Sequence, residues 1–300
     1  MADKKFIQSP LAAFNHVYGF SGESLVATPV QSINSIINGN NMAVLKSLLP
    51  ELSNCVNCIL VDLTNKGAST NWLQLLKECF PLFFKLLNKS GSIYVFVDEL
   101  ELDNLKTLIN GQFGEYEIMY SIVWQNRTSV NEQGVYVDKK NYIVCISNIE
   151  NKLLKFNWIA QLSPDNDQPV LAWFSEDVGD DEEANNYFTD LFADEPKPVA
   201  FIKPVRLIER ILKNELMNDG IVLDVCAGIG TTAHSVLQLN NKDNGNRSFI
   251  LIEDHEFCKT ITAKGLQRII KESATQKGIQ GNFNYYTITE KVAFNNEQLN

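Results

Sequence analysis

The sequence contains no long hydrophobic run. No apolar stretch approaches the roughly 20 residues that a helix needs to cross a bilayer, and a mixed polar stretch, unlike a signal peptide, follows Met1 to Lys5. We therefore expect a cytoplasmic protein with no membrane segment. Internal repeats and low-complexity tracts are also absent, and 300 residues with 45% hydrophobic content can bury a sizeable core.

Cysteine is scarce, with six residues in a chain of 300. This number does not make a disulfide framework, and most of the cysteines lie in apolar runs that suit reduced core thiols. Cys55 and Cys58 form a C-x-x-C pair, but a structural zinc site needs a second pair at suitable spacing, and there is none. We predict no metal site and interpret the pair as buried strand residues, with metal or redox use as the alternative.

Basic residues are also fewer than acidic ones. Lysine and arginine total 26 against 36 acidic residues, which gives a formal charge of −10. A protein that grips duplex DNA unaided normally presents a basic surface to the phosphates. The charge therefore argues against independent DNA binding, although a local basic face around Lys203, Arg206 and Arg210 remains open because the acidic residues concentrate between 176 and 195.

Hydrophobic periodicity predicts strands that alternate with helices from residue 32 onward. Apolar runs at 56–61 and 92–97 read as strands, and 71–87 and 101–109 as helices. Further on we expect a hairpin of strands 118–124 and 142–147, a short helix 182–192, helices 204–217, 231–239 and 255–271, and strands 221–225, 249–253 and 284–288. Such alternation implies a doubly wound α/β fold with a mostly parallel sheet. We predict that strands 56–61 and 221–225 lie side by side at its centre, which brings Asp62 and Asp224 to one crevice.

The domain organisation follows from the breaks in this pattern. Residues 1–30 lack periodicity and are expected to form an N-terminal arm. Residues 31–300 are expected to form one domain, in which an acidic, proline-broken insertion or linker (151–200) separates two halves, 31–150 and 201–300.

The most specific local signal is the run from Asp224 to Thr232, DVCAGIGTT, which leaves an apolar strand and enters a helix. Gly228 and Gly230 allow the backbone to approach a ligand closely, and the next strand ends in Glu253, which can accept hydrogen bonds from both hydroxyls of a ribose. The pattern indicates a nucleotide-cofactor crevice. An ordinary tight turn beside a solvated glutamate is the alternative.

These segments are similar to a known family. Residues 203–212, 222–234 and 249–253 resemble the C-terminal half of β-class DNA amino-methyltransferases, especially the modification (Mod) subunits of type III restriction systems. Weaker similarity at 37–45, 91–98, 175–184 and 281–286 extends the resemblance to about 33–289. It implies a Rossmann-like methyltransferase sheet of seven strands with a circularly permuted order of motifs.

The resemblance also implies S-adenosylmethionine as the cofactor. Asp224 and Gly228 would then line its methionine end, Glu253 would hold its ribose, and Lys203 would lie in the motif that closes the methionine side. The cofactor residues implied in this way are Asp224, Ala227, Gly228, Gly230, Thr231, Glu253, Lys203 and Asn40.

The family carries its chemistry on an Asp-Pro-Pro-Tyr motif, which this chain replaces with Asp62-Leu63-Thr64-Asn65. In the family, the aspartate and a backbone carbonyl direct the lone pair of an exocyclic amino group at the methyl donor, and the aromatic ring stacks on the flipped base. Loss of the ring removes about 1–3 kcal/mol of stacking. Asp62 and Asn65 are the candidate catalytic residues, and Trp72 is either a substitute platform or, as we prefer, a core residue.

Other departures concern DNA recognition. Asn40 stands where the family usually has an acidic residue, Lys140-Asn141-Tyr142 replaces His-Glu-Tyr, and little room remains for a target-recognition region. We expect a catalytically impaired subunit that binds S-adenosylmethionine and pairs with an intact methyltransferase homologue, through which it meets DNA. The alternatives are an active DNA adenine-N6 (or cytosine-N4) methyltransferase with a divergent motif, and an unrelated small-molecule methyltransferase or nucleotide-binding protein.

Overall fold

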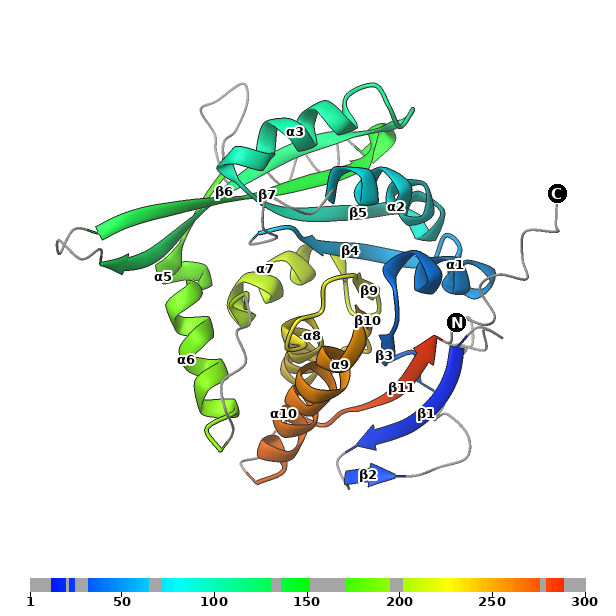
Figure 1. Cartoon of the computed structure of the whole chain (residues 1–300), viewed down its shortest axis with the longest axis vertical. Helices are drawn as coiled ribbons and strands as arrows, with labels where there is room; N and C mark the ends of the chain where they lie inside the picture. Colours follow the sequence, from blue (N-terminus) through cyan, green and yellow to red (C-terminus); the bar gives the residue numbers. More distant parts are fainter. Residues whose placement is uncertain are drawn as a thin grey trace.

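The computed structural model describes residues 12–19, 22–24, 32–64, 72–130, 136–151, 171–194, 202–275 and 279–288. Within these residues one sheet of eleven strands has the order β2-β1-β11-β3-β10-β9-β4-β5-β7-β6-β8 (Figure 1). The strands are β1 (Ala12–Gly19), β2 (Gly22–Ser24), β3 (Ser35–Asn38), β4 (Val56–Asp62), β5 (Leu87–Asp98), β6 (Tyr116–Val130), β7 (Tyr136–Asn148), β8 (Leu171–Phe174), β9 (Ile221–Asp224), β10 (Ser248–Glu253) and β11 (Asn282–Ile288).

Helices connect most of these strands. They are α1 (Asn41–Leu52), α2 (Trp72–Leu86), α3 (Glu99–Ile109), the 3₁₀ turn η1 (Ile149–Asn151), α5 (Ser175–Val178), α6 (Asp181–Leu191), α7 (Val205–Glu215), α8 (Thr231–Asp243), α9 (His255–Phe257), the π-helical segment η2 (Cys258–Ala263) and α10 (Lys264–Thr275). The expected helices are present, although the one predicted over 255–271 is divided into α9, η2 and α10.

The sheet is mostly parallel, as predicted. Strands β11, β3, β10, β9, β4 and β5 run parallel to one another, whereas β1 pairs antiparallel with β11, and β7 pairs antiparallel with both β5 and β6. At the centre β4 pairs with β9, so that Leu60 lies opposite Asp224. The predicted contact between the two halves of the chain, on either side of the acidic segment, is therefore confirmed.

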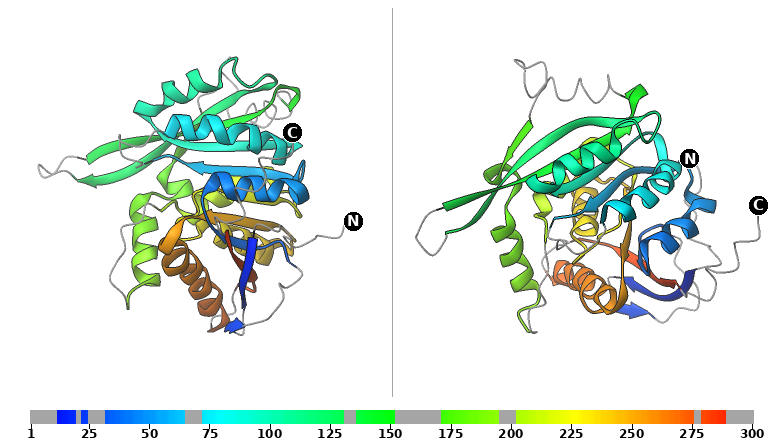
Figure 2. Two further views of the ribbon diagram at one scale, coloured as in Figure 1. Left: turned by 45° about the vertical axis from the view of Figure 1, so that its right-hand side comes forward. Right: turned by 45° about the horizontal axis from the view of Figure 1, so that its top comes forward.

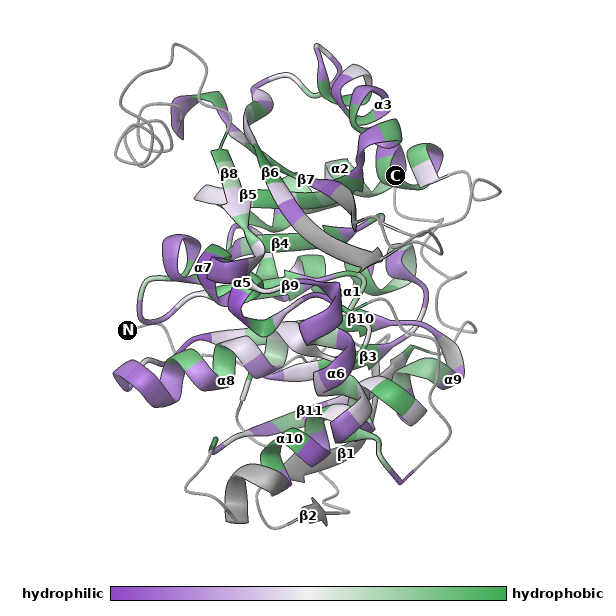
Figure 3. Ribbon diagram, turned by 90° about the vertical axis from the view of Figure 1, so that its left-hand side faces the viewer, coloured by the Kyte–Doolittle hydropathy of each residue, from purple (hydrophilic) through white to green (hydrophobic). Residues whose placement is uncertain are grey.

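Helices cover both faces of this sheet, and each face has its own hydrophobic core. Side chains of α1, α2 and α3 pack on one face, and those of α6, α7, α8 and α10 pack on the other. The two layers are seen in the turned views of Figure 2. Figure 3 shows the central strands β4 and β5 as predominantly hydrophobic, whereas α6 is mainly hydrophilic. This is the burial expected for strands that are covered on both faces.

Three predictions about the sheet need correction. Eleven strands are present instead of seven, because the edges are extended beyond the expected core. Leu171–Phe174, within the predicted acidic linker, forms β8 and pairs with β6, since Leu171 and Trp173 bury their side chains there. Ala12–Gly19, within the predicted arm, forms β1 and pairs with β11.

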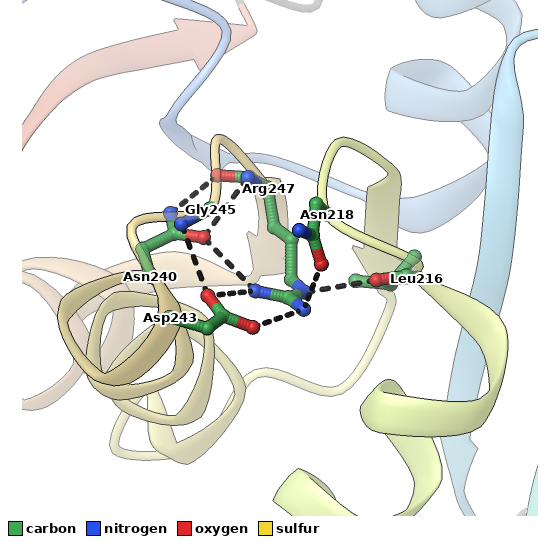
Figure 4. A network of polar contacts seen from close by, with 6 residues as sticks. All are labelled: Leu216, Asn218, Asn240, Asp243, Gly245 and Arg247. Carbon is green, nitrogen blue, oxygen red and sulfur yellow. Dashed lines mark hydrogen bonds and ion pairs between the residues drawn. The ribbon is translucent and has the colours of Figure 1, made fainter.

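A buried arginine fastens the amino ends of the central strands, at the edge opposite the strand ends discussed below. Arg247 is 4% exposed, and its guanidinium donates to the Leu216 carbonyl (2.8 Å), to Asn218 and to both carboxylate oxygens of Asp243 (Figure 4). Bidentate pairing of this kind holds the end of α8 against β10 and the turn after α7.

In the described part of the chain no helix combines the length and apolarity of a membrane span.

Candidate functional site

The turn after β9 is built around the buried carboxylate of Asp224. One oxygen accepts the backbone N–H of Cys226 at 2.9 Å, and the other accepts the hydroxyl of Thr232 at 2.5 Å. Gly228 and Gly230 both have positive φ, at 53° and 86°, and Gly230 caps the start of α8. These are conformations that glycine adopts without strain, so the sequence pattern folds as the tight strand-to-helix turn that it predicts.

Burial dominates the electrostatics of Asp224. Loss of solvation raises the pKa of its carboxyl group to about 6, and the negative charges of Asp62 and Glu253 act in the same direction against the two hydrogen bonds. A site with this excess of negative charge favours a positively charged ligand group.

Glu253 lies at the end of β10, next to this turn. Its carboxylate accepts the backbone N–H of Gly228 at 2.8 Å and that of Asp254 at 3.1 Å. Because each carboxylate oxygen can accept more than one hydrogen bond, Glu253 can tie the glycine turn to β10 and still accept from a ligand hydroxyl.

At the end of β4 the carboxylate of Asp62 is held from two sides. Oδ1 accepts the backbone N–H of Thr64 at 3.0 Å and its hydroxyl at 2.6 Å. Oδ2 accepts the ammonium of Lys203 at 2.6 Å, and the same ammonium donates to the Thr64 hydroxyl at 2.7 Å. Lys203 is 8% exposed and lies 5.7 Å from the ring centre of Phe96. Asp62, Thr64 and Lys203 therefore form a closed polar cluster.

The two residues that replace the family's prolines use backbone groups that proline lacks. The N–H of Leu63 donates to the carbonyl of Phe96 at 2.9 Å, and the N–H of Thr64 donates to Asp62. Proline has no N–H to offer at either position. At Leu63 and Thr64 hydrogen bonds of the backbone therefore hold the turn, in place of the ring constraint of two prolines.

Asp62 and Asp224 line one crevice, as predicted. Its walls come from the ends of β4, β5 and β9, from the glycine turn and from the residues before α7, and the enclosed volume is only about 30 Å³. The lining residues are Leu60, Asp62, Phe96, Ile202, Lys203, Ile208, Asp224, Cys226, Ala227, Gly228, Ile229, Thr231 and Thr232.

The remaining predicted site residues do not all line the crevice. Ala227, Gly228, Thr231 and Lys203 line the crevice. Asn40 is exposed and caps α1 by accepting the N–H of Met42; it follows β3, whose Asn38 lies opposite Glu253. Asn65 lies outside the described residues.

Sequence reasoning missed several contributors to the site. Thr64 was seen only as a lost proline, although a hydroxyl two residues after an aspartate is a recognised local hydrogen-bond partner. Thr232 fixes Asp224, and a signal for it existed in the Thr-Thr pair that opens α8. Asn41 donates its side-chain amide to the carbonyl of Val225 at 3.0 Å, and no sequence signal marked that contact.

A larger cavity of about 400 Å³ lies between α6, α7 and α8. It shares only Lys203 with the crevice, and its charged groups are paired with one another, Arg206 with Glu183 and Lys242 with Glu209. We place the candidate site in the smaller crevice because its polar groups converge there. In the described residues no group of three or more His, Cys, Asp or Glu side chains could hold a metal ion.

Known proteins resemble the chain over much of its length. The Mod subunit of the type III restriction-modification enzyme StyLTI, from Salmonella typhimurium, is 23% identical over 306 aligned residues, covering 73% of this chain and 46% of that protein. The EcoP15I Mod subunit of Escherichia coli is 22% identical over 315 residues, covering 67% and 49%. The chain therefore spans about half the length of these curated relatives.

Solved structures share the fold. The PvuII cytosine-N4-specific DNA methyltransferase has a TM-score of 0.56 at 16% identity, over 81% of this chain and 91% of that one. A complex described as M1.HpyAVI with SAM has a TM-score of 0.51 at 16% identity, over 77% and 98%. The family model described as a DNA methylase, of the N6/N4 type, matches residues 61–264. Because that match covers about two thirds of the chain, including the strand ends that build the crevice, the protein belongs to the N6/N4 DNA methylase family.

Proposed function

We propose that the chain is a methyltransferase-family subunit that binds S-adenosylmethionine in the crevice between β4 and β9. In this proposal it does not methylate DNA alone but assembles with an intact homologue in the cytoplasm. The observation that carries the proposal is the state of Asp62, whose carboxylate already accepts three hydrogen bonds, from Lys203 and Thr64.

The chemistry of the crevice fits the cofactor. S-adenosylmethionine supplies a methyl group activated by a sulfonium, and it also carries an ammonium, a carboxylate and two ribose hydroxyls. Asp224 offers a negative charge for the ammonium, Lys203 a positive charge for the carboxylate, and Glu253 acceptors for the hydroxyls.

The occupied carboxylate argues against transfer by the chain alone. A target amino group is a weak, neutral donor, and at Asp62 it would have to share the carboxylate with an ammonium at 2.6 Å in a largely buried pair. Charge-assisted hydrogen bonds are about twice as strong as neutral ones, so the amino group competes poorly with Lys203 for the carboxylate. The turn that follows Asp62 also lacks the family's aromatic platform, which removes a further stacking contribution of about 1–3 kcal/mol.

The alternative is an active DNA adenine-N6 methyltransferase with a divergent motif. The observation that favours it is that Asp62 keeps its place in the crevice, beside Asp224 and the aromatic ring of Phe96. If the cofactor's carboxylate attracts Lys203, the Asp62 carboxylate becomes free to accept the target amino group.

Cofactor binding is tested first by titration calorimetry with S-adenosylmethionine and S-adenosylhomocysteine. Wild type should bind both, and Gly228→Asp should bind neither, because a carboxylate at a positive-φ turn faces Glu253 and Asp224. Absence of binding to wild type at millimolar ligand would contradict the proposal that the crevice binds S-adenosylmethionine.

Catalysis is tested by transfer of labelled methyl groups to mixed genomic DNA. We expect no transfer by the chain alone, and more transfer by an intact homologue together with the chain than by that homologue alone. Turnover by the single chain that disappears in Asp62→Ala would overturn the impaired-subunit proposal and establish the alternative.

A further inference from the structure

The cavity of about 400 Å³ between α6, α7 and α8 has the size of a small-molecule pocket. These are the helices at the left and centre of Figure 1. From α8 the cavity is lined by His234, Gln238 and Lys242, which are spaced four residues apart and therefore form one row along the helix. Among the described residues only Lys203 lines both this cavity and the crevice.

Two groups of this row have no hydrogen-bond partner within the described residues. Nδ1 of His234 contacts the Tyr187 hydroxyl at 3.2 Å, but Nε2 and the side-chain amide of Gln238 make no such contact. His234 is 8% exposed. Burial and the charge of Lys242 lower the pKa of His234 to about 4, so the ring is neutral at pH 7 and Nε2 can bond to a neutral ligand group.

The free amide and the neutral imidazole suit a flat heterocycle. An amide side chain offers a donor and an acceptor together, which is the set that pairs with the N6 and N7 edge of adenine. The rings of Tyr187 and His234 are stacked, with their centres 5.4 Å apart, and they add an aromatic wall against which such a ring can pack.

The charged groups of the cavity keep donors to spare. The ammonium of Lys242 contacts both oxygens of Glu209, at 2.8 and 3.0 Å, which leaves at least one N–H for a ligand. The guanidinium of Arg206 pairs with Glu183 and donates to the carbonyl of Glu176, which leaves two of its five N–H groups. The spare capacity therefore favours a ligand rich in acceptors.

The start of α7 adds to this preference. Its N-cap, Pro204, provides no side-chain hydrogen bond, and Val205 and Arg206, whose backbone N–H groups lie in the first turn, both line the cavity. The uncapped start of a helix carries a partial positive charge and binds phosphate groups.

We infer that this cavity is a second binding site, separate from the crevice, for a small anion of mononucleotide type. Its flat ring lies against the row on α8, and its phosphate meets Arg206 and the start of α7. Lys203, whose ammonium is held by Asp62, borders both sites. A phosphate in the cavity and a cofactor carboxylate in the crevice attract this one ammonium, so each ligand weakens the other without excluding it. The statement about the cofactor rests on the proposed function.

The ligand chemistry is tested by titration calorimetry of the whole chain with adenosine monophosphate, adenosine and inorganic phosphate. Wild type should bind the monophosphate about tenfold more tightly than adenosine or phosphate, and Gln238→Leu should weaken its binding about tenfold. Gln267→Leu is the matched control, because Gln267 is a half-buried residue of α10 with no hydrogen-bond partner within the described residues, and it lines neither site.

The contribution of the phosphate is tested at Arg206. Arg206→Met should remove the preference for the monophosphate over adenosine. Arg210→Met should keep that preference, because Arg210 lies on the same helix but packs over the ring of Trp173, at 4.7 Å.

The separation of the two sites is tested by repeating the monophosphate titration at rising concentrations of S-adenosylhomocysteine. Two coupled sites predict that the apparent Kd rises about fivefold and then levels off. A rise without limit would place the monophosphate in the crevice and overturn the inference, and no rise at saturating S-adenosylhomocysteine would overturn the shared role of Lys203.

Three other results would also overturn the inference. They are no binding of the monophosphate to wild type at millimolar ligand, equal weakening by the two glutamine variants, and inorganic phosphate that binds as tightly as the monophosphate. If S-adenosylhomocysteine fails to bind while Gln238→Leu still weakens monophosphate binding, the proposed function fails and the second site stands.

Discussion

At the scale of single residues, the buried carboxyl group of Asp224 makes the stability of the fold depend on pH. Its carboxylate is buried in the folded protein, with a pKa of about 6, whereas an unfolded chain ionises it near 3.8. The folded state therefore holds the proton more tightly than the unfolded state. This contribution is fully present below about pH 3.8 and is lost as the pH rises to about 6.

We predict that Asp224→Asn stabilises the fold at pH 8 by up to about 3 kcal/mol, which corresponds to a shift of about two pKa units. Asparagine can still accept from Cys226 and can donate to the Thr232 hydroxyl. Urea unfolding at pH 4 and pH 8 measures the effect, which should be small at pH 4. The same variant should lose affinity for S-adenosylmethionine, and equal stability of variant and wild type at pH 8 would contradict the argument.

The cluster of Asp62, Thr64 and Lys203 makes a second prediction at this scale. Thr64→Val keeps the backbone N–H but removes the hydroxyl that links Lys203 to Asp62, so we expect a loss of about 1–2 kcal/mol. Lys203→Met should cost about 3 kcal/mol, at the low end for a broken buried pair because the Asp62 side chain is 19% exposed.

A double-mutant cycle measures whether the two side chains act together. The two losses should not add, and a coupling of more than about 0.5 kcal/mol is expected for groups that share a hydrogen bond. Lys213→Ala, on the exposed side of α7, is the control for loss of a lysine. Additive losses would mean that Thr64 and Lys203 act independently on Asp62.

At the scale of elements, the turn after β4 is the point where the chain departs most from its family. Leu63 and Thr64 each donate a backbone N–H, to Phe96 and to Asp62. We predict that Leu63→Pro/Thr64→Pro, which restores the family's residues, destabilises the protein by about 2 kcal/mol or more, because both donors are removed and their acceptors are left without partners.

Thermal unfolding of this double variant measures the cost, and Leu63→Ala/Thr64→Ala, which keeps both N–H groups, is its control for the lost side chains. A restored variant as stable as wild type would show that the turn still accepts the family's geometry. In that case the next experiment is to measure methyl transfer to DNA by the same variant.

At the scale of the whole molecule, the order of the strands joins the two halves of the chain. Strand β4, from the first half, lies between β5 and β9, and β3 lies between β10 and β11. Neither half can leave the sheet without exposing the central strands.

We therefore predict one cooperative unfolding transition for residues 31–300, although chains longer than about 150 residues often unfold in steps. Near-ultraviolet circular dichroism reports on the buried Trp124 and Trp173, and far-ultraviolet circular dichroism reports on the helices of both faces. The two urea midpoints should coincide within error. Separate midpoints would mean that the halves are independent units.

Much of this architecture follows from local signals. The apolar run before Asp62 and the apolar run before Asp224 predict buried parallel strands, and the glycine turn predicts its own positive φ angles. Strand β8 escaped prediction because it is an edge strand of only four residues. Strand β1 escaped prediction because its residues lie in a stretch without hydrophobic periodicity. The split of the helix over 255–271 by the π-helical segment η2 also had no sequence signal.

The sequence by itself determined the alternation of strands and helices, the tight turn at Gly228 and Gly230 and the acidic residues at three strand ends, because these depend on neighbours along the chain. Only the tertiary structure decided that Lys203 pairs with Asp62, 141 positions away. It also decided that the pKa of Asp224 lies near 6. Contacts of this kind depend on the order of strands in the sheet and on the loss of water around buried charges, which no local pattern of residues encodes.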